Sequence, residues 1–206
     1  MTLQVPVVHE PSSDIPLVEL RHVFTSGAAM EAPGQEGLGR IAIRLLRRGA
    51  AGKDRRQMDE ALDRIAAVLS AQASPDFYAV HVRVLRKHLE KAADLLAEAF
   101  LEPTLDDGEL ERLKRETIAE IVSSRDDDRF LASRALRITM FPDHPYGRPS
   151  RGTVESVERI TRDDVMGFLG AHMVRDGLIL GAAGDVTAED LGAVTARTVG
   201  KLPARQ

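Results

Sequence analysis

The arginines of residues 36–49 are the part of this sequence whose types and spacing bear most directly on chemistry. This segment has the alternation of apolar and charged residues typical of a short amphipathic helix, and it follows a turn rich in glycine and proline. On a helix, residues i and i+4 lie one above the other, so two histidines there can bind one zinc ion, and a glutamate just before the second can serve as general base. In this chain Arg40 and Arg44 occupy such a pair of positions, and Ile43 precedes the second. Because arginine keeps its proton and has no lone pair for a metal, and isoleucine exchanges no proton, this helix cannot form that hydrolytic site.

Spacing alone also fits a simpler interpretation of the same arginines. Long cationic side chains can lay their aliphatic stems along an apolar surface and keep their charged ends in water. A solvated helix face would then need no functional explanation. The four residues concerned are Arg40, Arg44, Arg47 and Arg48.

Two kinds of element must position this helix. The strands are predicted at residues 5–9, 17–24, 70–74, 77–85 and 178–183, from apolar alternation and flanking turn residues. The first two are separated by a short turn-rich segment, which favours an antiparallel hairpin. The later helices are predicted at residues 55–69, 87–100, 107–124, 128–140, 161–172 and 188–199, with Asp54 and Thr161 as N-caps.

This order of elements predicts an α+β fold, with an antiparallel-rich sheet and helices packed mainly on one face. A parallel α/β sheet is the weaker alternative, because only two helical segments connect strands singly. No linker or internal repeat divides the chain, so we expect residues 1–206 to form a single domain.

Composition narrows the classes of function. The net charge of −4 and the pI near 5.9 argue against a nucleic-acid partner, and no apolar run is long enough for a membrane segment. The absence of cysteine excludes disulfides and leaves the compartment undetermined. The localisation therefore stays unknown: cytoplasmic for the sequence as given, and periplasmic or exported if a signal has been removed.

Beyond the arginine-rich helix, short motifs recur in a fixed order along nearly the whole chain. Together they resemble the pitrilysin/insulinase family of inverted zinc proteases, which includes mitochondrial processing peptidase and bacterial two-subunit relatives. The matching residues are Pro16, Gly27, Glu31, Gly37-Leu38, Gly49, Ser70-Ala71, Pro103, Glu120-Ile121, Phe141, His144-Pro145-Tyr146-Gly147, Gly152, Thr161 and Gly184-Asp185-Val186.

The resemblance implies where a zinc site would be. Active members carry H-x-x-E-H on this helix, and here Arg40 and Arg44 stand at the histidine positions and Ile43 at the glutamate position. The third zinc ligand of the family falls on Glu120, and the position of a supporting carboxylate is taken by Leu113. We therefore expect no zinc and no other cofactor. We also expect Arg44 or Arg40 to pair with Glu120, a guanidinium replacing the metal charge.

The resemblance further implies a non-catalytic role. Family members are built from repeated α+β units, and in some two-subunit members only one subunit carries zinc. The chain resembles the N-terminal unit of the other subunit, which would help a zinc-bearing partner enclose and process a peptide or protein, without being an enzyme on its own. The edge strand that pairs with substrate in active relatives corresponds to Ser70, Ala71, Gln72, Ala73 and Ser74.

Two other functions stay open at this point. One is a free-standing scaffold domain that binds a protein or peptide. Separately, the isolated domain is a possible homodimer. The other is an active zinc metallopeptidase with a divergent site. The six histidines offer it little support, since no two of them are spaced i,i+4.

Overall fold

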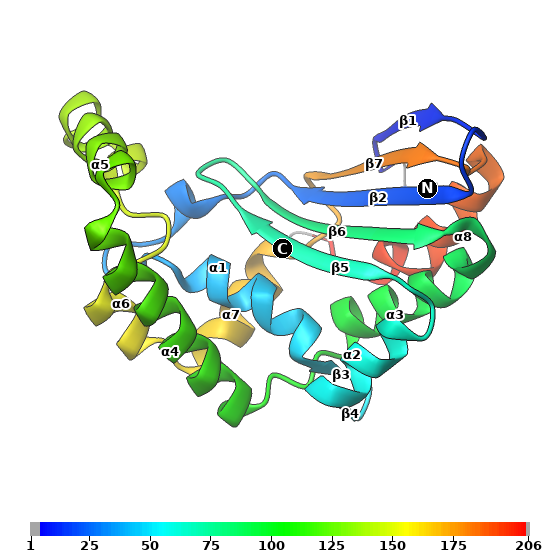
Figure 1. Cartoon of the computed structure of the whole chain (residues 1–206), viewed down its shortest axis with the longest axis horizontal. Helices are drawn as coiled ribbons and strands as arrows, with labels where there is room; N and C mark the ends of the chain where they lie inside the picture. Colours follow the sequence, from blue (N-terminus) through cyan, green and yellow to red (C-terminus); the bar gives the residue numbers. More distant parts are fainter. Residues whose placement is uncertain (1–4, 205–206) are drawn as a thin grey trace.

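A five-stranded sheet forms one side of the protein, along the upper part of Figure 1. The structure is a computed structural model that describes residues 5–204. The strand order is β1-β7-β2-β6-β5, and every neighbouring pair except β1 and β7 is antiparallel. The strands are β1 (Val7–Pro11), β2 (Leu17–Phe24), β5 (Val68–Ala73), β6 (Tyr78–Leu85) and β7 (Leu178–Gly184).

The helices cover mainly one face of this sheet, below it in Figure 1. Along β6, Val80, Val82 and Val84 are buried on the helix side, whereas His81 and Arg83 alternate with them on the open side. The predicted α+β fold with one helical face is thus confirmed. The helices beneath the sheet are α1 (Leu38–Leu45), α2 (Arg55–Asp63), α3 (Leu89–Leu101), α7 (Arg162–His172) and α8 (Ala188–Arg197).

The predicted hairpin between the first two strands is wrong. β1 pairs in parallel with β7, with Val7 opposite Leu180 and Pro11 opposite Gly184, and β7 separates β1 from β2. β7 is an apolar strand that gains backbone partners on both edges by entering this position. Because β1 and β7 are far apart in the sequence, the residues between β1 and β2 give no indication that β1 pairs with β7.

Element boundaries shift where the backbone turns sharply. The helix expected over 55–69 ends at Asp63, and Ala66 has a left-handed φ of 49° before β5 begins at Val68. The apolar residues keep their helical spacing beyond Asp63, so the sequence pattern did not show where the helix ends. A short helix, α6 (Val154–Arg159), was also missed, although Thr153 and Ser156 form a capping box at its start.

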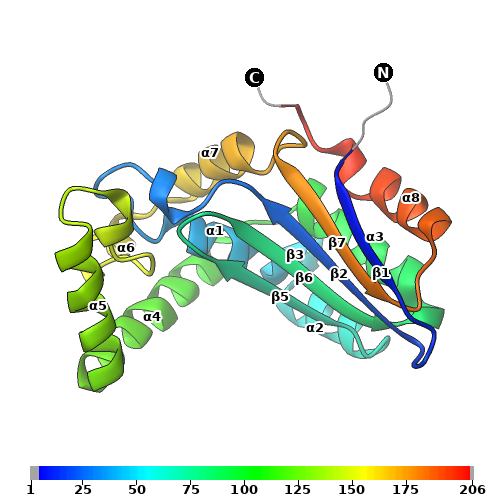
Figure 2. The same cartoon turned by 90° about the horizontal axis from the view of Figure 1, so that it is seen from above.

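Two helices flank the sheet at one end. α4 (Asp107–Ser123) packs against α1, and α5 (Asp128–Met140) stands away from the body, on the left of Figures 1 and 2. No residue of α5 is buried. A two-stranded ribbon of β3 (Gly49–Ala50) and β4 (Lys53–Asp54) follows α1.

Within residues 5–204, no helix is both long enough and apolar enough to cross a membrane.

Candidate functional site

A buried carboxylate fixes the start of α1. Glu31 accepts hydrogen bonds from the backbone N–H groups of Gly37 (2.9 Å) and Gly39 (2.7 Å) and from the Tyr78 hydroxyl (2.9 Å). Burial raises the pKa of Glu31, and these three donors work in the opposite direction. Gly37 has a left-handed φ of 92°, which suits glycine. The position of α1 therefore depends on a contact with β6 as well as on its own sequence.

The two faces of α1 differ sharply. Ile41 and Ile43 are buried in the core against the sheet, with at most 1% of each residue exposed. Arg40 and Arg44 project from the other side toward α4. Ile43, which stands where a general base would be needed, is thus a packing residue.

Arg40 and Arg44 share one carboxylate. Nη2 of Arg40 donates to Oε2 of Glu120 at 2.7 Å, and Nη2 of Arg44 donates to Oε1 of the same residue at 3.1 Å. Arg44 also reaches Oγ1 of Thr117 at 3.5 Å. These side chains are partly shielded, with exposures of 24% for Arg40, 23% for Arg44 and 37% for Glu120. The structure therefore places both guanidinium groups on Glu120.

Arg48 continues the series one turn further along. Its guanidinium binds Glu116 at 2.6 Å and Glu109 at 3.0 Å, and only 10% of the side chain is exposed. The Arg48 hydrogen bond is the largest cause that lowers the pKa of Glu116. The simpler alternative, a solvated face, therefore does not apply to Arg48.

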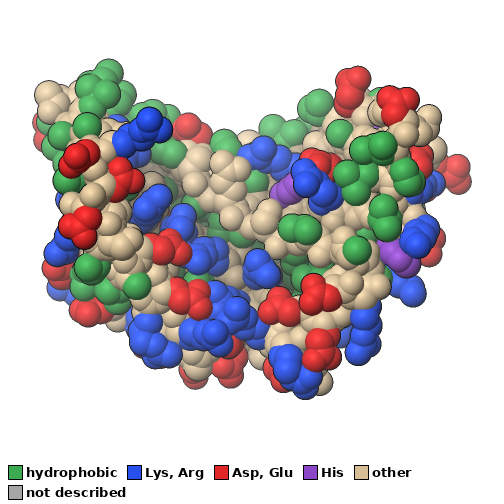
Figure 3. All heavy atoms as spheres, viewed as in Figure 1, with side chains coloured by type: hydrophobic (Ala, Val, Ile, Leu, Met, Phe, Trp, Pro, Cys, Tyr) green, Lys and Arg blue, Asp and Glu red, His purple; other side chains and the backbone are tan. Residues whose placement is uncertain are grey.

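These contacts form one continuous structure, which we call the arginine ladder. It consists of Arg40 and Arg44 on α1 and Arg48 in the 3-10 turn that follows it, facing Glu120, Glu116 and Glu109 on α4, with the two segments antiparallel along the contact. In the space-filling view, Lys and Arg side chains gather over the same region, between the helices on the left and the sheet (Figure 3).

The residues of the ladder do not fit a zinc site. The two positions next to Glu120 hold guanidinium groups, which have no lone pair to donate, and they already neutralise its charge. Across residues 5–204, no group of three or more histidines, cysteines or carboxylates could hold a metal ion. Leu113 is fully buried in the core, so its position also offers no supporting carboxylate.

The predicted edge strand lies beside α1. β5 forms one edge of the sheet, pairs only with β6 among the described strands and packs against α1. Ser70 to Ala73 belong to β5, but Ser74 lies in the turn that follows, where its Oγ accepts from the N–H groups of Asp76 and Phe77. The strand thus begins and ends earlier than its predicted span of 70–74.

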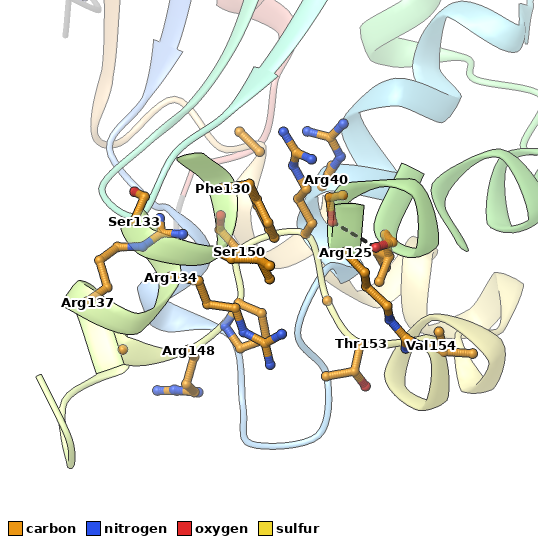
Figure 4. Close-up of a pocket in the computed structure, with 18 of the residues that line it drawn as sticks. Arg40, Arg125, Phe130, Ser133, Arg134, Arg137, Arg148, Ser150, Thr153 and Val154 are labelled. Atoms are coloured by element: carbon orange, nitrogen blue, oxygen red, sulfur yellow. Dashed lines mark hydrogen bonds between the residues drawn. The ribbon is translucent and has the colours of Figure 1, made fainter. Parts of the chain in front are cut away.

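A pocket of about 520 Å³ opens where β5 ends, and Figure 4 shows it in close-up. Ala73 from β5 and Arg40 from the ladder both line it. Its other walls come from the end of α4, from α5 and from the loop before α6. Six arginines line the pocket, namely Arg40, Arg125, Arg134, Arg137, Arg148 and Arg151, and Glu155 is its sole carboxylate. Five of these arginines, all except Arg40, were not predicted from the sequence as site residues. Their concentration between residues 125 and 151 is the signal that could have identified them.

Two of the histidines, His144 and His22, make local structural contacts. His144 Nδ1 accepts from the N–H of Tyr146 at 3.2 Å, and its ring contacts those of Phe141 and Tyr146. His22 is fully buried on β2, edge-on to Phe100, and burial lowers its pKa to about 4.

Comparison with known proteins identifies the family to which the fold belongs. The model of the family "Insulinase (Peptidase family M16)" matches residues 7–154. The chain is 24% identical to "Uncharacterized zinc protease YmxG" of Bacillus subtilis, over 89% of this chain and 45% of that protein. It is 23% identical to the human "Cytochrome b-c1 complex subunit 1, mitochondrial", over 86% of this chain and 37% of that protein. The chain therefore spans less than half the length of these curated relatives.

Among solved structures, a crystal structure described as the peptidase M16 inactive domain from Pseudomonas fluorescens superimposes with a TM-score of 0.88 at 25% identity. The similarity covers 97% of this chain and half of that one. Since the family model accounts for most of the chain and the folds agree, this protein belongs to the insulinase family, peptidase family M16.

Proposed function

We propose that the chain is a non-catalytic M16 unit that helps a zinc-bearing partner enclose and process peptides. The observation that carries this proposal is the double hydrogen bond from Arg40 and Arg44 to Glu120. In place of ligands and a general base, the site has two fixed cations and a buried isoleucine, Ile43. The chain cannot then activate water at this position by itself.

Peptide binding is assigned to the free edge of β5. An edge strand presents unpaired backbone donors and acceptors, to which an extended peptide can add as a further strand. Ser70 and Gln72 are exposed along β5, and the strand lies beside α1. A peptide added there would run past the arginine ladder.

The exposed apolar residues of α5 support the proposal that another protein binds this chain. Leu136, Ile138 and Met140 are 59%, 47% and 61% exposed on a helix that has no buried residue. Large apolar side chains grouped on one helix are typical of surfaces that another protein covers. The human relative is named as a subunit of a complex, which agrees with an assembled role for this fold.

A combined assay tests the proposal. The chain is mixed with a zinc-bearing M16 subunit from the same organism, and complex formation is followed by size-exclusion chromatography. Hydrolysis of a quenched fluorescent peptide is measured for each protein alone and for the mixture, and zinc is determined by elemental analysis. We expect no zinc and no hydrolysis with the chain alone, a complex in the mixture, and faster hydrolysis than with the partner alone.

Two single substitutions test whether the zinc-bearing partner binds at α5. Leu136→Asp should weaken the complex, whereas Met166→Asp, at an equally apolar residue on α7 that is 41% exposed, should leave it unchanged. Stoichiometric zinc with hydrolysis by the chain alone would instead support the divergent metallopeptidase. A stable monomer that binds peptide but neither associates with the partner nor changes its activity would support the free-standing scaffold.

A further inference from the structure

We propose that the arginine-lined pocket at the end of β5 selects peptides that carry a carboxylate, from an acidic side chain or from the C-terminus. This inference rests on the proposed peptide binding along β5 and adds a preference for charge. The charge of the pocket is opposite to that of the whole chain. The whole chain has a net charge of −4, yet six arginines and one glutamate line this pocket.

The arginines come from separate segments and meet only in the folded protein. Arg40 lies on α1, Arg125 follows α4, Arg134 and Arg137 lie on α5, and Arg148 lies in the loop before α6 (Figure 4). Their charges repel one another unless an anion lies among them. Such a grouping is costly for an unliganded fold and favourable for one that binds a carboxylate.

Several of these cations are not used by the fold itself. Arg40 is paired with Glu120, and Arg148 donates to the backbone carbonyls of Glu31 and Ala29. Arg134 and Arg137, by contrast, form no ion pair and no side-chain hydrogen bond within residues 5–204. They are spaced i,i+3 on α5, so their guanidinium groups can approach one ligand together.

The walls of the pocket suit an amino-acid side chain. Phe130, Leu131, Ile121 and Val154 supply apolar surface between the arginines. The volume of about 520 Å³ lies within the range of small-ligand pockets. A glutamate or aspartate of a peptide could pack its stem on these residues and place its carboxylate between guanidinium groups, where charge-assisted hydrogen bonds are strong.

Continuity with β5 favours a peptide over a nucleic acid. Ala73, near the end of β5, lines the pocket, so a peptide paired along this edge would continue into it. The Arg151 guanidinium covers one face of the Phe130 ring, 5.1 Å from its centroid, so this ring offers at most one face for stacking a base. The acidic chain as a whole would also repel a long polyanion.

The experiment compares matched peptides. Fluorescein-labelled octapeptides of alternating valine and threonine carry two central glutamates, glutamines or lysines, all with amidated C-termini, and a fourth keeps the glutamines but has a free C-terminus. Binding to the chain is measured by fluorescence anisotropy. We expect the glutamate peptide, the free C-terminal peptide, or both, to bind roughly tenfold more tightly than the amidated glutamine peptide. The lysine peptide should bind more weakly still.

A double variant links this preference to the pocket. Arg134→Gln with Arg137→Gln should reduce the preference for carboxylate to within roughly twofold. A control with the same charge change, Arg56→Gln with Arg64→Gln on and next to α2, should retain it, because these exposed arginines lie outside the pocket. Circular dichroism melts confirm that both variants are folded.

The outcomes separate the two proposals. Equal binding of all four peptides, the one with the free C-terminus included, would overturn the charge preference and leave peptide binding along β5 intact. Binding of none of them would overturn both. A single-stranded oligonucleotide that binds more tightly than the glutamate peptide, and loses affinity in the Arg134→Gln/Arg137→Gln variant, would assign the pocket to nucleic acid and overturn the inference.

Discussion

Arg40 and Glu120 join α1 to α4 through a 2.7 Å hydrogen bond between Nη2 and Oε2, and Arg44 holds the other carboxylate oxygen. We propose that these two cations stand at the positions of two zinc ligands of active M16 members, next to the third ligand position. The charge that a divalent ion would supply is thus built into the chain. Arginine stays protonated at any working pH, so this contact between the helices does not depend on a bound ion.

The first prediction is that zinc binding can be restored. Arg40→His with Arg44→His supplies two imidazoles spaced i,i+4 beside Glu120, which gives three ligands. About one zinc per chain should remain after dialysis, as measured by elemental analysis, with no hydrolysis because the buried Ile43 supplies no base.

Adding Glu120→Gln to that double variant should lower its zinc affinity at least roughly tenfold, because one ligand is lost. If the zinc content were the same with and without Glu120, the carboxylate would not be positioned as a ligand.

The second prediction concerns the stability of the arginine ladder. Arg48→Ala leaves Glu116 and Glu109 without their most buried partner and should lower the free energy of unfolding by about 2 kcal/mol. Arg56→Ala removes an exposed pair with Glu60 and should change it by less than about 0.5 kcal/mol. Urea denaturation of both variants measures the difference, and equal effects would mean that the burial of Arg48 contributes nothing.

The third prediction tests the close approach of α1 to β6. A Cβ added at Gly39 would lie 2.2 Å from the Tyr78 hydroxyl oxygen and 2.6 Å from Phe168, so Gly39→Ala should destabilise the protein by about 1–3 kcal/mol. In α7, a Cβ at Gly167 would meet no atom within 4 Å, and Gly167→Ala should stabilise the helix by up to about 1 kcal/mol. Thermal melts should therefore shift in opposite directions, and a neutral Gly39→Ala would show that the helix can move away.

The fourth prediction is a loss of stability in mild acid. Burial lowers the pKa of His22 to about 4, whereas its value in the unfolded chain is near 6.5. Between these values the unfolded state binds the proton and the folded state does not, so stability should fall as pH drops from 6.5 to 4. The limiting slope is about 1.4 kcal/mol per pH unit, for a total of about 3 kcal/mol.

His22→Phe removes the titrating group while keeping a ring beside Phe100, and it should flatten this part of the stability curve. Urea denaturation at several pH values compares the two proteins. An unchanged slope in the variant would assign the acid sensitivity to other residues.

The residue types and local spacing were sufficient for much of the fold. Period-two alternation placed the strand of Val80, Val82 and Val84, and N-cap chemistry placed the helix starts after Asp54 and Thr161. These signals depend on contacts between near neighbours in the chain, which the sequence contains directly. The arginines at positions 40 and 44 likewise cannot ligate zinc, on chemical grounds that do not depend on the tertiary structure.

Other features depended on contacts between distant segments. The pairing of β1 with β7 joins segments about 170 residues apart in the chain, and neither strand carries a local signal for it. Spacing could not distinguish Arg48 on a solvated face from Arg48 between Glu109 and Glu116, because the burial of a long side chain depends on the helix packed against it. The arginine-lined pocket is the clearest case. Its cations are spread from Arg40 to Arg151 in the sequence, and only the packing of α1, α4, α5 and the loop before α6 brings them together.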